Sequence, residues 1–333
     1  MENNNDNGSD SPFDISGLLN GDRRSLARSI TLIESSRVDH RAEAEELLDK
    51  VMPNTGGSIR IGISGPPGVG KSTFIESFGQ YVIRKKQKIA VLTVDPSSKC
   101  SGGSILGDKT RMPKLGQSDM AFIRPSPAGI TLGGVARRTR EAILLCESAG
   151  YDIVLVETVG VGQSEYAVSD MVDMFVLLAQ PGGGDDLQGI KRGVMELADL
   201  IIVTKADGDL KRSAMQAEND LKSGISLLKK DFDIWKPKVL TCSSITGEGM
   251  EEVWSIIKLY QDTIDKHGEL QRKRGHQART WMWSEVQEAL VASLRESPLA
   301  SDLAQKFEVD VVNGRLAPTV AARKLLKTFM AGN

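Results

Sequence analysis

A glycine-rich segment constrains the fold more than any other part of the chain. The letters GPPGVGKST, residues 65–73, follow the apolar run SIRIGISG and precede a stretch with helical spacing. The pattern G-x-x-x-x-G-K-[ST] between a strand and a helix is that of a Walker A loop, whose backbone amides surround phosphate groups. Glycine makes up 33 of the 333 residues, so the flanking strand and helix are what make the match specific. The candidate phosphate-binding residues are Gly65, Pro66, Pro67, Gly68, Val69, Gly70, Lys71, Ser72 and Thr73.

Apolar runs further along the chain predict a sheet. Most are apolar on both faces, as strands of a parallel sheet covered by helices should be. The stretches between them have helical spacing, which predicts a doubly wound α/β domain with its ligand beyond the carboxyl ends of the strands. The strands are expected at 58–65, 88–95, 120–125, 151–158, 174–180, 199–205 and 237–244, with helices at 72–85, 134–148, 188–198 and 211–230.

Helical spacing also occurs on both sides of this domain. We expect a disordered polar tail over residues 1–20, a helical extension over 21–56, the P-loop domain over 57–268 and a helical region over 269–333. Helices of the last region would either cap the sheet or bury their apolar stripe in a second subunit.

Composition excludes several classes of protein. A net charge of -2 gives no reason to expect nucleic-acid or membrane binding through bulk electrostatics. The three cysteines, Cys100, Cys146 and Cys242, are widely spaced and suggest neither a disulfide framework nor a zinc site. No apolar run approaches the ~20 residues of a membrane span, and the acidic, Arg-free N-terminus is unlike a targeting peptide. We therefore expect a cytoplasmic protein, or a mitochondrial one only if a transit peptide has been removed.

Acidic residues at predicted strand ends favour a magnesium site. Asp95 and Glu157 end two apolar runs, and Asp108 closes the glycine-rich loop after the first of them. A magnesium ion bound by the Ser72 hydroxyl and phosphate oxygens keeps waters that such carboxylates can hold. The alternative is that each acid only caps a turn. Three acids around one phosphate loop favour the metal.

Two loops have the composition of nucleotide-responsive segments. In ETVGVGQSE, the amide of Gly160 is placed to sense a γ-phosphate, and Gln163 or Ser164 would neighbour an attacking water. We take Lys71, Glu157 and Gln163 as the candidate catalytic residues. The segment QPGGGDDLQGIKRG, residues 180–193, is either a plain turn with an acidic helix cap or a third mobile loop, and its length and glycine content favour the loop.

The run DLIIVTKADGD, residues 199–209, is a candidate base reader. The Asp207 carboxylate can accept hydrogen bonds from the N1–H and amine of guanine, which adenine does not offer. Lys205 would extend over the base and across the phosphate loop. A lone K-x-D is also a common start of an exposed loop. Its position favours base reading, because it ends the sixth predicted strand and TCSSITGEG ends the seventh, where a second base-contacting loop belongs.

These motifs together resemble one family. The segments GISGPPGVGKSTFIE, AVLTVDPSS, GGSILGDKTRM, LGGVARRTRE, GYDIVLVETVGVGQSE, GGGDDLQGIKRGVMELAD and TKADGD are similar to the MeaB/ArgK family of GTPases associated with methylmalonyl-CoA mutase. The resemblance covers nearly everything after the first twenty residues. It implies a P-loop GTPase that uses GTP, GDP and Mg²⁺, and a chaperone that protects an adenosylcobalamin-dependent mutase and gates its cofactor loading.

The resemblance also assigns residues. Ser72, Asp95, Asp108 and Glu157 would surround magnesium, Lys205 and Asp207 would read guanine, and Ser243, Ser244 and Ile245 would flank the base. The loop from Asp185 to Lys191 would be an extra switch that communicates with the mutase, and the C-terminal helices would form a homodimer arm. The family often has Asn where this chain has Thr204. Because Asn mainly braces loops, we expect the Thr hydroxyl to replace part of the bracing, with guanine preference retained.

Other functions fit parts of the same pattern. An ATP-dependent kinase linked to transport of basic amino acids, a label the family has also carried, would use the same P-loop but needs adenine. A nucleotide-gated scaffold for another partner would hydrolyse GTP incidentally. Nickel delivery is disfavoured, because His40, His267, His276 and the cysteines form no cluster in the sequence. No arginine finger is identifiable, so slow intrinsic turnover that a partner accelerates is expected.

Overall fold

The computed structural model describes residues 13–35, 37–94, 112–125, 132–158, 164–182, 192–226 and 234–332. The chain divides into two compact units, the first ending at Arg274 and the second beginning at Gly275. The first unit holds the sheet and the phosphate loop. The second is helical.

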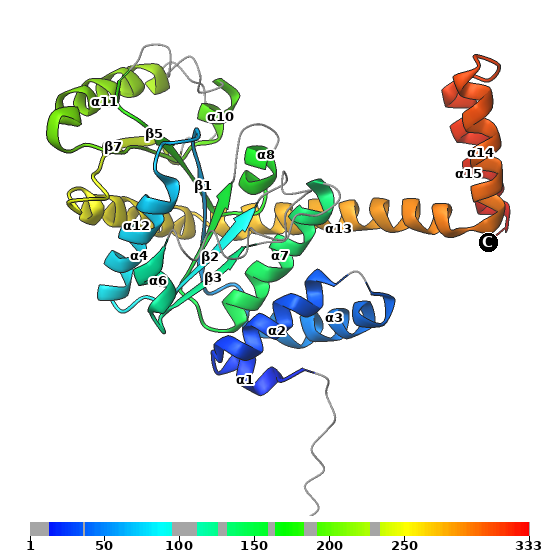
Figure 1. Ribbon diagram of the computed structural model, residues 1–333, viewed down its shortest axis with the longest axis horizontal. Helices are drawn as coiled ribbons and strands as arrows, with labels where there is room; N and C mark the ends of the chain where they lie inside the picture. Colours follow the sequence, from blue (N-terminus) through cyan, green and yellow to red (C-terminus); the bar gives the residue numbers. More distant parts are fainter. Residues whose placement is uncertain are drawn as a thin grey trace, which may run out of the picture. The chain divides into compact units, whose positions relative to one another are not determined.

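A parallel sheet forms the centre of the first unit (Figure 1). Its seven strands have the order β3-β2-β4-β1-β5-β6-β7, and every neighbouring pair is parallel. All seven predicted strands are confirmed, with ends that differ by a few residues. They are β1 (Ile59–Ser64), β2 (Ile89–Val94), β3 (Ala121–Pro125), β4 (Ile153–Thr158), β5 (Met174–Ala179), β6 (Leu200–Val203) and β7 (Lys238–Thr241).

The strands lack polar alternation because both faces of the sheet are covered. In β2, β4, β5 and β6 every residue is buried. The central β1 places Ile61 opposite Leu155 of β4 and Met174 of β5. Apolar side chains therefore point into a core on each side of the sheet. The predicted doubly wound architecture is confirmed.

One face is covered by α4 (Lys71–Arg84), α6 (Pro113–Gln117) and α12 (Met250–Lys266). In that core the rings of Phe74 and Phe78 stack with centroids 5.7 Å apart. The other face is covered by α7 (Leu132–Ser148), α8 (Ser164–Ser169), α10 (Arg192–Leu197) and α11 (Lys211–Ser226).

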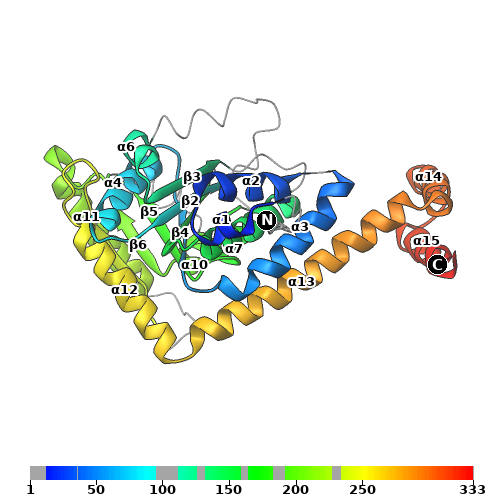
Figure 2. The same ribbon diagram turned by 90° about the horizontal axis from the view of Figure 1, so that it is seen from below.

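The N-terminal helices pack on the outside of α7 (Figure 2). They are α1 (Ile15–Leu19), α2 (Arg23–Glu34) and α3 (Val38–Val51), followed by the 3-10 turn η1 (Met52–Asn54). The predicted disordered tail of residues 1–20 is wrong at its C-terminal end. Asp14 caps α1 by accepting a hydrogen bond from the amide of Gly17, and Leu18 is fully buried. These contacts hold a short helix in place that has too few residues to show periodicity.

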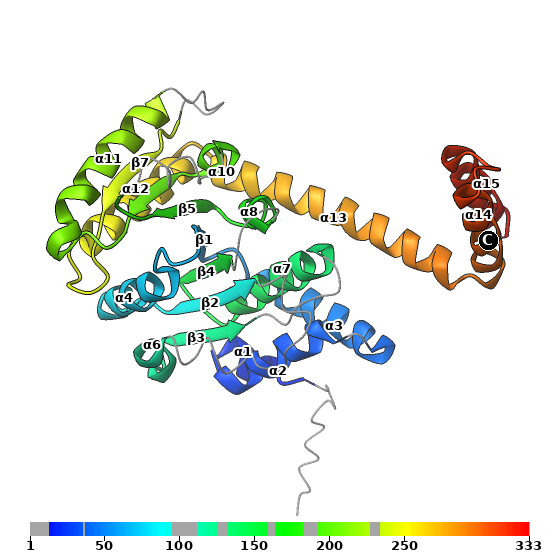
Figure 3. The ribbon, with the colours of Figure 1, turned by 45° about the horizontal axis from the view of Figure 1, so that its top comes forward.

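The second unit consists of helices. α13 (Glu269–Glu296) begins in the first unit and continues into the second, where α14 (Pro298–Val312) and α15 (Pro318–Gly332) lie side by side (Figure 3). Among the described residues no helix is both long and apolar enough to cross a membrane.

The first turns of α13 are fixed to the sheet by a buried ion pair. Arg274 donates to both carboxylate oxygens of Asp173, at 2.8 and 2.6 Å, and to the carbonyls of Gly56 and Ser58 at 2.7 and 2.6 Å. The Asp173 side chain is only 1% exposed, so this charge depends on Arg274 for neutralisation.

Candidate nucleotide-binding site

The phosphate loop leaves the end of β1 and leads directly into α4. A Cβ atom on Gly65 would lie 2.7 Å from the carbonyl oxygen of Leu178 on the neighbouring β5, so a larger residue does not fit. Gly70 has a φ of 95° and caps α4 in the left-handed conformation. The sequence therefore folds here as the Walker A pattern predicts, with the loop leading directly into a helix N-terminus, which is a common place for an anion to bind.

Lys71 lies back over the loop. Its ammonium donates hydrogen bonds to the carbonyls of Gly65 at 2.7 Å and Pro66 at 3.3 Å. Burial lowers the pKa of Lys71, and the nearby carboxylates of Glu157 and Glu165 oppose that fall. The ammonium is thus held beside the loop opening by groups of the loop itself.

Ser72 and Glu157 present the oxygen atoms that magnesium prefers. The Ser72 hydroxyl donates to Oε1 of Glu157 across 3.4 Å, and Glu157 is only 4% exposed at the end of β4. Hydroxyl and carboxylate oxygens suit Mg²⁺, so these residues fit the predicted metal. The other predicted residues of this side, Asp95, Asp108 and Gln163, lie outside the described residues.

The loop after β6 is joined to the phosphate loop by two hydrogen bonds. The Thr204 hydroxyl lies 2.7 Å from the carbonyl oxygen of Val69 and 3.2 Å from that of Ala179. Lys205 has a left-handed φ of 58°, which turns its side chain so that the ammonium donates to the carbonyl of Gly68 at 2.7 Å. Lys205 therefore reaches across the phosphate loop as expected from sequence.

Asp207 is held by the loop that follows β7. The Ser243 hydroxyl donates to Oδ2 of Asp207 and accepts from the amides of Ile245 at 3.3 Å and Thr246 at 3.1 Å. Ser243 is fully buried, whereas Ile245 is 82% exposed and Ser244 is half-buried. These contacts bring together the lysine, the acid and the serine loop that the sequence places in separate segments.

Two contacts of the site were missed by sequence reasoning. The Thr158 hydroxyl donates to Oγ of Ser64 at 3.0 Å and so joins the ends of β4 and β1. Glu165, in the first turn of α8, is only 4% exposed and lies close enough to Lys71 to influence its pKa. The sequence gives no signal of such pairings between strand ends and a helix, because they depend on the order of the strands in the sheet.

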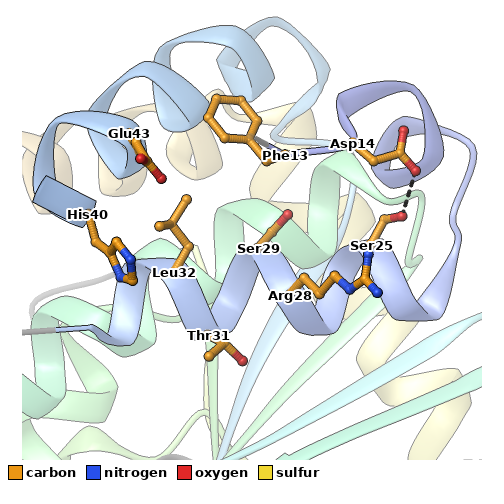
Figure 4. A pocket seen from close by; sticks show the side chains of 9 residues that line it. All are labelled: Phe13, Asp14, Ser25, Arg28, Ser29, Thr31, Leu32, His40 and Glu43. Carbon is orange, nitrogen blue, oxygen red and sulfur yellow. Dashed lines mark hydrogen bonds between the residues drawn. The ribbon is translucent and has the colours of Figure 1, made fainter. Parts of the chain in front are cut away.

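A cavity lies among the N-terminal helices. It has a volume of about 280 Å³ and is lined by residues of α2, α3 and the segment before α1 (Figure 4). The Ser25 hydroxyl donates to Asp14 at 2.8 Å at one end of it. In the ranges that the structure describes, no group of three or more His, Cys, Asp or Glu side chains is placed to hold a metal ion. The lining residues are Phe13, Asp14, Ser25, Arg28, Ser29, Thr31, Leu32, His40 and Glu43.

Comparison with known proteins identifies one family and a similar fold. The profile of the family described as methylmalonyl-CoA mutase-associated GTPase MeaB matches residues 26–298. The chain is 48% identical to the mitochondrial methylmalonic aciduria type A homolog of Mus musculus, over 94% of this chain and 78% of that protein. It is 45% identical to the GTPase ArgK of Escherichia coli strain K12, over 93% and 94% of the two chains. A solved structure of an LAO/AO transport system kinase superposes with a TM-score of 0.75 at 38% identity, covering 95% of this chain and 96% of that one.

Proposed function

The chain belongs to the MeaB family of methylmalonyl-CoA mutase-associated GTPases, and from this membership we propose that it is a chaperone of a cobalamin enzyme. As a family member it is a P-loop GTPase that binds guanine nucleotides. The client is an adenosylcobalamin-dependent mutase of the methylmalonyl-CoA mutase type. GTP binding and hydrolysis protect this mutase and gate the loading of its cofactor. The names of the family and of the mouse relative support this assignment.

Guanine is read by Asp207 and Lys205. The observation that carries this assignment is the pair of bonds from Thr204 to Val69 and from Lys205 to Gly68, which fix the base loop to the phosphate loop. Ser243 holds one carboxylate oxygen of Asp207, which orients the acid toward the N1–H and amine of guanine. Adenine would leave that carboxylate unpaired, which disfavours ATP. Ser243, Ser244 and Ile245 flank the base.

The phosphates lie in the loop of residues 65–73, with Lys71 on the β and γ oxygens. Ser72 and Glu157, together with Asp95 and Asp108, would hold Mg²⁺. When bound, this ion neutralises the charge that develops on the phosphate oxygens. Lys71 stabilises the same charge, and Gln163 orients the attacking water.

The loop from Asp185 to Lys191 is an extra switch that communicates with the mutase. Because no arginine finger is identifiable in the sequence, intrinsic turnover is slow and rises when the mutase binds. Measuring GTP hydrolysis with and without a methylmalonyl-CoA mutase tests this directly. A rate that rises with the mutase supports the proposal. Equal, fast turnover in both samples, together with no retention of the mutase in either nucleotide state, contradicts it.

The chain forms a homodimer through its C-terminal helices. Along α13 no residue is buried, and the helices of the second unit expose large apolar side chains to solvent. A second copy of the same helices is a partner that covers such a stripe. The exposed residues are Met282, Trp283, Val286, Leu290, Val291, Val309, Val312, Val320, Leu326 and Met330.

The kinase in the name of the similar solved structure gives a second candidate function. An ATP-dependent kinase would require that adenine enter the base site beside Asp207. Competition against bound GDP separates the two functions. Displacement by GTP but not by ATP supports the GTPase, whereas equal displacement by both nucleotides contradicts the role of Asp207.

A further inference from the structure

Helix α8 lies unusually close to the strand that leads into the phosphate loop. A Cβ atom on Gly62 of β1 would be 2.8 Å from Cγ1 of Val168 and 3.1 Å from Cγ2 of Val172. The missing side chain at Gly62 therefore allows α8 and the residues after it to pack directly on β1. Any shift of α8 would therefore displace β1, which ends at Ser64, directly before the phosphate loop.

The first turn of α8 faces the nucleotide side. Glu165 is buried there, and its carboxylate lies close enough to Lys71 to interact with the ammonium charge. The strand before α8 is β4, which carries Glu157 beside Ser72. The position of α8 is thus linked to both sides of the phosphate site.

The residue after Glu165, Tyr166, brings α8 into contact with α10. The Tyr166 hydroxyl oxygen lies 2.3 Å from where a Cβ on Gly193 would be, while the ring carbon Cζ lies 3.6 Å from it. Only glycine at 193 leaves room for this oxygen. The ring is otherwise 51% exposed, so little else holds it in place.

We propose that Tyr166 is a positioning residue for GTP hydrolysis. Its hydroxyl packs against Gly193 and thereby fixes the position of α8 relative to α10. Helices α8 and α10 follow β4 and β5, the two strands that flank β1 in the sheet. A contact between them joins the two sides of the phosphate loop through described, packed residues. The inference rests on the nucleotide site proposed above and adds a residue that does not touch the nucleotide.

A pair of small substitutions isolates this contact. In Gly193→Ala the added methyl group meets the Tyr166 oxygen, and because the ring is exposed it swings away without disturbing the core. In Tyr166→Phe the oxygen is gone and the ring remains. In the double variant the methyl group occupies the space of the oxygen, since Cζ is at an ordinary contact distance. The double variant should therefore restore the packing between residues 166 and 193 that Gly193→Ala disrupts.

The test is the steady-state hydrolysis of GTP by the full chain without a partner. Gly193→Ala and Tyr166→Ala are expected to lower kcat by roughly fivefold with KM within about twofold. Tyr166→Phe, which leaves the space of the oxygen empty, is expected to lower kcat in the same way, whereas the double variant Tyr166→Phe/Gly193→Ala is expected to stay within about twofold of the wild type, which makes the two substitutions non-additive. An equal thermal midpoint of Gly193→Ala and the wild type would exclude loss of fold as the cause.

Wild-type kcat in both Gly193→Ala and Tyr166→Ala overturns this proposal and leaves the proposed function intact. A double variant as slow as Gly193→Ala alone also overturns it. Failure of a mutase to bind or to accelerate hydrolysis affects only the proposed function, because the partner is absent from this test. Absence of GTP hydrolysis by the wild-type chain would overturn both.

Discussion

The hydroxyl of Thr204 lies 2.7 Å from the carbonyl oxygen of Val69 and joins the loop after β6 to the phosphate loop. The two residues are 135 positions apart, and Thr204 is 2% exposed. A buried hydrogen bond of this kind fixes the spacing between the proposed base and phosphate sites. The threonine at position 204 thus makes a bracing contact between the two loops.

Removing this hydroxyl should weaken nucleotide binding. In Thr204→Val the shape is kept, but the Val69 carbonyl loses its hydroxyl donor inside the protein, at a cost of about 1–3 kcal/mol. We expect GDP affinity to fall by roughly tenfold. Titration with a fluorescent GDP analogue measures it, and Thr204→Ser, which keeps the hydroxyl, serves as the control. Wild-type affinity in Thr204→Val would show that the contact is dispensable.

Lys205 should contribute more to GDP affinity than Lys211, a lysine on the nearby surface. Lys205→Ala removes the bond to the Gly68 carbonyl and the stem that covers the base, so we expect GDP affinity to fall by roughly tenfold. Lys211 pairs with Glu248 on the surface, where an ion pair contributes at most about 1 kcal/mol. Lys211→Ala is therefore expected to bind GDP as the wild type does. Equal affinities of the two variants would contradict the role of Lys205.

The phosphate loop should tolerate no side chain at its first glycine. In Gly65→Ala the methyl group would lie 2.7 Å from a backbone oxygen of β5, which cannot move without distorting the sheet. We expect loss of GTP binding and a thermal midpoint lowered by several degrees. Gly57→Ala is the matched control, because a Cβ there meets nothing within 4 Å. Normal GTP binding by Gly65→Ala would be incompatible with the described loop.

The ion pair at the base of α13 should contribute strongly to stability. Arg274→Met leaves the buried Asp173 carboxylate without its partner, at an expected cost of about 3–5 kcal/mol. Urea unfolding measures the difference. The exposed pair of Lys222 and Glu218 gives the comparison, since Lys222→Met is expected to cost at most about 1 kcal/mol. A similar small loss in both variants would mean that Asp173 is solvated in solution.

The two described cysteines should resist alkylation in the native protein. Burial raises the pKa of Cys242 to about 12 and raises the pKa of Cys146 further, so both remain thiols at pH 7 to 8. Iodoacetamide followed by peptide mass spectrometry should modify them only after denaturation. Rapid labelling of Cys242 in the native state would indicate that the loop after β7 opens.

The fold was predictable because its signals are local. Each strand is apolar on both faces wherever the sheet is covered, so the runs that contain Ile61, Leu155 and Leu177 are recognisable without the structure. The phosphate loop is equally local, because the positions of Gly65 and Gly70 follow from backbone geometry. In contrast, α1 was missed because its stability comes from one cap at Asp14 and one buried side chain at Leu18.

The site was predictable in its residues but not in its contacts. Asp207 and Ser243 are 36 positions apart, and they meet because β6 and β7 are neighbours in the sheet. The contact between Tyr166 and Gly193 likewise depends on the order of β4, β1 and β5 in the sheet. Asp95, Asp108 and Gln163 stay predictions, since they lie outside the described residues.

The central claim is that Asp207 selects guanine, and exchanging one hydrogen-bonding group tests it. Asp207→Asn presents an amide donor where guanine has a donor and xanthine an acceptor. The preference between GTP and XTP should therefore reverse, with the affinity for GTP lowered and the affinity for XTP raised by at least about tenfold. Asp209→Asn, an exposed neighbour, should keep the wild-type preference. Unchanged GTP binding by Asp207→Asn, without any gain in XTP binding, would contradict the assignment.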